Sequence, residues 1–159
     1  MIAEAVVDRS PHTIRAATSG DIPRLIEMGR RFIAETAYRD LVVANPQRIT
    51  QIIEEVMAAP DGIVLVSVSE RGIVGMIGVL VYPHPFSGER TGFDLCWWVE
   101  PEARGHGVRL MRAAEAWARE HGATQMQMVA PNPRVEGLYQ RLGYRAIEVA
   151  YQRRLTPCP

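Results

Sequence analysis

The run from Arg104 to Arg109 has residue types and spacing that suit phosphate binding. Gly105 and Gly107 stand between an apolar run that ends at Val99 and an amphipathic segment. Glycine lets a backbone approach a ligand closely, and a helix start offers unpaired N–H groups and the positive end of its dipole. The two arginines add charge that suits a phosphate. We therefore predict an anion site, in which His106 contributes only its backbone N–H. The expected contacts are Arg104, Gly105, His106, Gly107, Val108 and Arg109.

Two familiar nucleotide-binding patterns do not fit this run. The Rossmann pattern needs a third small residue, but Leu110 stands at that position. The strand expected after the helix, residues 124–130, also ends without an acid for a ribose. The P-loop pattern requires Gly-Lys-Ser/Thr, which is absent from the sequence. CoA remains as a phosphate-bearing partner.

A second segment, residues 132–144, resembles the last helix of the GNAT N-acetyltransferase superfamily. The matching residues are Asn132, Val135, Leu138, Tyr139, Gly143 and Tyr144. Residues 99–107 resemble the CoA-binding segment of that superfamily, and residues 14–22 resemble its usual start. The resemblance thus extends from about Thr13 to Leu155, although the glycine turn is shorter than the usual pattern.

The resemblance implies direct transfer of an acetyl group from acetyl-CoA to an amine, with no covalent enzyme intermediate. We expect no metal, because Cys96 and Cys158 have no paired spacing and no nearby cluster of His or Cys. It also implies that the pantetheine of CoA pairs with the exposed backbone of Trp97, Trp98 and Val99, where a backbone N–H can polarise the thioester. Tyr139 matches the position of the proton donor to the departing thiolate; its simpler alternative is an aromatic residue that packs the helix on the sheet. Asn132 could bind the amide groups of CoA, cap the helix, or do both.

The general base is less defined by the sequence. Asp94, at the start of a buried strand, is the first candidate, and the alternative is an acid at the strand edge in contact with solvent. His84 in a Pro-rich loop is the second candidate. The catalytic Glu that some relatives carry in the following strand is absent, because Gln125 and Gln127 stand there.

These residues require a layered fold to bring them together. We expect an α+β domain with a mixed, mostly antiparallel sheet, about four flanking helices and splayed strands at the CoA site. Hydrophobic periodicity predicts the elements. Expected strands are 12–18, 63–69, 73–82, 93–99, 124–130 and 144–155, and expected helices are about 21–34, 45–57, 107–121 and 134–142.

Composition limits the remaining possibilities. The 159 residues suit one domain, expected at 12–159 after an N-terminal extension, 1–11. Zero formal net charge argues against a nucleic-acid partner, and no apolar run reaches the roughly 20 residues of a membrane span. We expect a cytoplasmic enzyme, a small-molecule or protein amine as acceptor, and a homodimer if the chain assembles. Two alternatives are a catalytically silent CoA-binding or sensory module and a domain that retains the fold without binding CoA.

Overall fold

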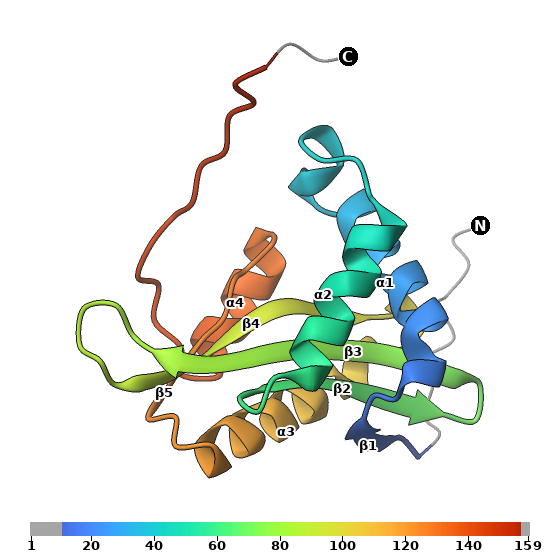
Figure 1. Ribbon diagram of the computed structural model, residues 1–159, viewed down its shortest axis with the longest axis horizontal. Helices are drawn as coiled ribbons and strands as arrows, with labels where there is room; N and C mark the ends of the chain where they lie inside the picture. The colour runs from blue at the N-terminus through green and yellow to red at the C-terminus, as the bar shows by residue number, and fades with distance from the viewer. Residues whose placement is uncertain (1–10, 157–159) are drawn as a thin grey trace.

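The computed structural model describes residues 11–156, and its centre is a five-stranded sheet in the order β1-β2-β3-β4-β5 (Figure 1). The first three neighbouring pairs are antiparallel, and the last pair is parallel. The β-branched runs in β2 and β3 favour these long central strands. The strands are β1 (Thr13–Ala16), β2 (Gly62–Ser69), β3 (Gly72–Pro83), β4 (Arg90–Val99) and β5 (Gln125–Gln127).

Helices cover both faces of the sheet. The α-helices are α1 (Ile22–Ala34), α2 (Pro46–Ala58), α3 (Gly107–Glu120) and α4 (Pro133–Arg141). Short 3-10 helices occupy Ser19–Asp21 (η1), Ala37–Asp40 (η2) and Pro101–His106 (η3). The starts of α2 and α4 follow from local chemistry, because the side chains of Asn45 and Asn132 accept hydrogen bonds from Arg48 N and Val135 N and a proline follows each cap.

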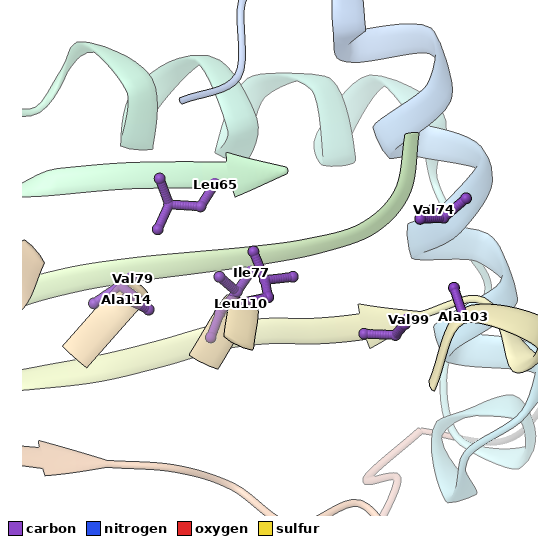
Figure 2. Close-up of a cluster of buried hydrophobic side chains, with 8 residues drawn as sticks. All are labelled: Leu65, Val74, Ile77, Val79, Val99, Ala103, Leu110 and Ala114. Atoms are coloured by element: carbon purple, nitrogen blue, oxygen red, sulfur yellow. The ribbon is translucent and has the colours of Figure 1, made fainter. Parts of the chain in front are cut away.

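The apolar residues form two clusters, one on each face. Leu25 and Met28 of α1 and Val56 of α2 pack with Met76 and Trp98 of the sheet. On the other face, α3 packs on the sheet. Figure 2 shows that second cluster, whose residues are Leu65, Val74, Ile77, Val79, Val99, Ala103, Leu110 and Ala114. The burial of both faces fixes β4 between the two helical layers.

The predicted fold class and most of the predicted elements are confirmed. Two elements differ. The expected strand 124–130 is reduced to three residues, and the expected final strand 144–155 is wrong. Residues 145–156 carry neither helix nor strand, and every one of them is exposed. A period-two pattern predicts a strand only where a neighbouring strand accepts its hydrogen bonds, and none of the five strands pairs with this segment.

The predicted N-terminal extension lies outside the described residues except for Pro11, so the division at residue 12 stays a prediction. Within the described part of the chain, no helix is long and apolar enough to cross a membrane.

Candidate active site

The candidate site lies where β4 and β5 separate. Their pairing covers only Thr91 to Phe93 against Gln125 to Gln127, and β4 then continues to Val99. A bulge in β4 opposite Gly78 and Val79 marks the same place. Such bulges bend a strand and interrupt its pairing. The backbone of β4 beyond Phe93 is therefore unpaired on its β5 side.

Asp94 lies at the point of separation. Its Oδ1 accepts a hydrogen bond of 2.8 Å from the backbone N–H of Val129, across the gap from β4. Burial raises the pKa of the Asp94 carboxyl to about 6, and the hydrogen bond from Val129 offsets only part of that effect. A carboxyl with this pKa is mostly ionised at neutral pH and can still accept a proton, which suits a general base.

Tyr139 of α4 reaches the other end of the same residue, Val129. Its ring is buried, and its hydroxyl donates to the backbone oxygen of Val129 at 3.4 Å. Burial, followed by the charge of Asp94, raises the pKa of Tyr139 well above its ordinary value. The phenol therefore stays protonated over the working pH range. The hydrogen bond is at the long limit, so the hydroxyl gives up little when it turns to another acceptor.

Neighbouring side chains shape the wall around these two groups. The ring of Trp97 lies 5.8 Å from that of Tyr139. The indole Nε1 of Trp97 is buried, and no described residue accepts its hydrogen bond. Cys96 faces the other side of the sheet, where burial raises the pKa of its thiol to about 12. Cys96 is therefore a neutral thiol and no nucleophile.

The predicted phosphate-binding turn is helical in the structure. Residues 101–106 form η3, which leads directly into α3. The N–H of Gly107 donates to the carbonyl of Arg104, and a Cβ at Gly107 would lie 3.1 Å from Trp97 Cζ2. A Cβ at Gly105 would meet nothing within 4 Å. Gly107 thus serves close packing on β4, whereas Gly105 borders open space.

Arg104 turns away from this helix start toward α1. Its Nη2 lies 3.3 Å from Glu35 Oε2, and its guanidinium lies 5.8 Å from the Trp98 ring centroid. Arg109 and Asn132 are exposed, and the side chain of Asn132 caps α4.

A buried carboxylate at the base of the turn was not anticipated from the sequence. Glu100 is 1% exposed, and its two oxygens accept from Arg24 Nη2 at 2.6 Å and Arg31 Nη1 at 2.8 Å. Arg24 also donates to the carbonyl of Ile73. We call Glu100, Arg24 and Arg31 the Glu100 clasp. It joins α1 to the end of β4, where the turn begins.

Of the predicted site residues, the structure brings Asp94, Trp97 and Tyr139 together. The second base candidate, His84, lies in the loop after β3, where its Nδ1 accepts from the N–H of Phe86. The side-chain amide of Gln125 donates to Glu89. Among residues 11–156, no cluster of histidine, cysteine and acidic side chains could hold a metal ion.

Comparisons with known proteins identify a family and a fold. The profile of the Acetyltransferase (GNAT) family matches residues 31–144. No curated protein matches the chain. Among solved structures, a predicted acetyltransferase with acetyl-CoA from Clostridium acetobutylicum is 16% identical over 91% of this chain and 97% of its own, with a TM-score of 0.75.

Two further structures have the same fold. AAC(6')-Iy in complex with the bisubstrate analogue CoA-S-monomethyl-acetylneamine is 15% identical over 94% of this chain and 100% of its own, with a TM-score of 0.74. A transcriptional regulator from Bacillus halodurans is 23% identical over 91% of this chain and 100% of its own, with a TM-score of 0.74. At these identities the likeness is one of fold.

Proposed function

The chain belongs to the Acetyltransferase (GNAT) family, and on this premise we propose that it transfers the acetyl group of acetyl-CoA to a primary amine by direct attack. One observation carries the proposal. Asp94 and Tyr139 come from different elements and bind opposite ends of one residue, Val129, at the separation of β4 and β5. A base and a proton donor therefore flank the gap in which a thioester could lie.

The residues present fit acetyl-CoA, which supplies the acetyl group as a thioester. The orphan N–H of Trp97 and the unpaired backbone of β4 are donors suited to the amide and thioester carbonyls of the donor substrate. The open space at Gly105 and the charge of Arg109 suit its pyrophosphate. Arg104 would join them by exchanging Glu35 for phosphate, and Asn132 lies at the start of the neighbouring helix α4.

Two proton transfers complete the reaction. The amine nitrogen attacks the thioester carbonyl carbon, a C–N bond forms, and the C–S bond breaks. Asp94 accepts the proton that the amine loses, directly or through a water molecule. Tyr139 donates its hydroxyl proton to the departing sulfur and recovers one from solvent. Each role contributes about 10²-fold or more to the rate in comparable acid–base catalysis.

The acceptor is a primary amine of a small molecule or a protein, and we place the reaction in the cytoplasm, where a free thiol such as Cys96 persists. A catalytically silent CoA-binding module is the second candidate. Gln125 and Gln127 of β5 favour it, because they stand where some relatives carry a catalytic Glu and an amide cannot act as a base.

The test follows the release of free thiol from acetyl-CoA with a panel of primary amines. We expect turnover with at least one amine class and an approximately hundredfold loss of kcat in Tyr139→Phe. The matched control is Tyr144→Phe, because Tyr144 donates its hydroxyl to Glu115 Oε1 at 2.6 Å, outside the gap. Tyr144→Phe should lower stability by about 1–2 kcal/mol and keep kcat. CoA binding without turnover on any amine would favour the silent module.

A further inference from the structure

Three large apolar side chains lie together on the face of the sheet that α1 and α2 cover in part. Strand register sets this face, because Phe93 pairs with Leu80, whose side chain packs in the cluster under α1 and α2. Tyr82 stands two residues beyond Leu80 in β3 and is therefore on the same face. Leu95 is the extra residue of the β4 bulge, and a Cβ at Gly78 would lie 3.7 Å from the Leu95 Cβ. We call Tyr82, Phe93 and Leu95 the Tyr82 patch.

The Tyr82 patch is apolar surface that the described part of the chain leaves open. The rings of Tyr82 and Phe93 stack with centroids 4.0 Å apart and an interplanar angle of 8°. Tyr82 is nevertheless 44% exposed, and Leu95 is 46% exposed. α1 and α2 lie over the middle of the sheet and do not extend to the loop that joins β3 to β4 (Figure 1). Contiguous apolar side chains of this kind, unlike scattered ones, mark a surface that binds a ligand or a partner.

The patch begins beside the group proposed to take the proton of the acceptor. Phe93 and Leu95 flank Asp94 in β4, and the pairing of β4 with β5 ends at Phe93. The edge of β4 is therefore free from Asp94 onward, and an amine held on the patch can reach the gap between the strands past this edge. Two residues of a strand span about 7 Å, a distance that an aromatic ring with a short aliphatic spacer covers.

The chemistry of this face selects the body of the acceptor. Asp94 pairs with Val79, which packs in the α3 cluster, so the Asp94 side chain belongs to the opposite face. On the face of the patch, no position within residues 78–82 of β3 or 91–96 of β4 carries a charged side chain. A charged acceptor body would lose water here without gaining a partner. An aromatic ring would instead stack on the exposed side of Tyr82.

We propose that the acceptor is a primary amine joined to an aromatic ring by a short aliphatic spacer, with the ring on the Tyr82 patch and the nitrogen in the gap beside Asp94. This inference rests on the acetyl transfer proposed above and names its substrate class. Tyr82 and Leu95 are specificity residues, because they contact the ring and take no part in the two proton transfers. The ring of the acceptor continues the stack that Tyr82 and Phe93 begin.

The test compares phenylethylamine with n-butylamine as acceptors, followed by thiol release from acetyl-CoA. We expect the wild type to favour phenylethylamine in kcat/KM by at least about tenfold, and Tyr82→Ser and Leu95→Gln each to reduce this ratio by about threefold or more. The ratio is taken within each variant, so a loss of folded protein affects both amines equally. Phe86→Ser is the matched control and should keep the ratio, because Phe86 is 90% exposed in the loop and its ring contacts that of His84.

A binding measurement separates failure of this inference from failure of the acetyl transfer. Saturation transfer by NMR should reach the ring of phenylethylamine in the wild type and be lost in Tyr82→Ser. Turnover of both amines without an aromatic preference would overturn the substrate class and leave the acetyl transfer intact. Ring binding that Tyr82→Ser abolishes, without turnover of any amine, would support the patch and contradict the transfer.

Three other results would also overturn the inference. The first is absence of both ring binding and turnover. The second is a wild-type ratio in both Tyr82→Ser and Leu95→Gln. The third is a dimer in sedimentation velocity that Tyr82→Ser dissociates, because a second copy of the chain would then cover the patch.

Discussion

The Glu100 clasp gives a prediction whose size follows from the structure. In Glu100→Gln the amide oxygen can still accept from Arg24, but the amide nitrogen meets Arg31, which can only donate. Breaking a fully buried ion pair costs about 3–5 kcal/mol. Here the side chains of Arg24 and Arg31 are 32% and 55% exposed, so water recovers part of the loss. We therefore expect Glu100→Gln to lower the free energy of unfolding by about 2 kcal/mol, and Tm by about 4–8 °C for a domain of this size.

Urea unfolding and calorimetry measure this change, and Glu102→Gln is the matched control in the same turn. Glu102 is only partly buried, so its substitution should stay within about 0.5 kcal/mol of wild type. The double variant Arg31→Met/Glu100→Gln should be less destabilised than the sum of the single variants by about 1 kcal/mol, because both substitutions remove the same ion pair between Arg31 and Glu100. A loss in Glu100→Gln no larger than that of Glu102→Gln, or strict additivity with Arg31→Met, would refute the reasoning.

Three further predictions concern the site and the sheet. The raised pKa of Asp94 predicts that activity grows as pH rises through about 6. Asp94→Asn should remove this pH dependence while it keeps an oxygen that accepts from Val129 N. The same pKa shift makes the folded state less stable by about 3 kcal/mol as pH rises from about 4 to above 6, because the unfolded chain loses its proton at the lower pH. Gly105→Asp should raise the Kd for CoA at least about tenfold, whereas the neutral, similarly sized Gly105→Asn should not, since open space at this position leaves charge as the difference; equal affinities would remove the turn from the CoA site. Gly92→Ala should cost about 1–3 kcal/mol in unfolding experiments, because its Cβ would lie 2.6 Å from Met126 Sδ and 3.2 Å from Ala118 Cβ. A neutral result would show that the flexible Met126 side chain moves aside without loss of packing.

Local patterns in the sequence were sufficient to predict most elements. Asn45-Pro46 and Asn132 start helices through bonds to residues three positions away, so their effect is visible within a short window. Asp94 and Tyr139 were also identified, one at the start of an apolar strand and the other through its helix motif. Their meeting at Val129 depends on a parallel strand pair, which the sequence does not specify.

Long-range contacts explain what the sequence did not predict. Glu100 carries a usable signal, an acid between a buried strand and a proline, but its partners lie 76 and 69 residues away. The helical form of residues 101–106 reflects packing of Ala103 and Gly107 on the sheet, not local composition. Residues 145–156 show the opposite failure, because their partly alternating pattern predicted a strand but none of the described strands pairs with them.

The Glu100 clasp also bears on the kinetics of a two-substrate reaction. It ties α1 to the turn proposed for CoA, and Arg104 with Glu35 ties the far end of the same helix. We expect η2, which follows α1 and contains Tyr38, to border the acceptor. Binding energies at two places joined in this way are reciprocal, so any factor by which CoA tightens acceptor binding must equal the factor by which acceptor tightens CoA binding. If α1 carries this coupling, it favours binding of acetyl-CoA before the acceptor. Substitutions that loosen the Glu100 clasp should then allow the two substrates to bind in either order.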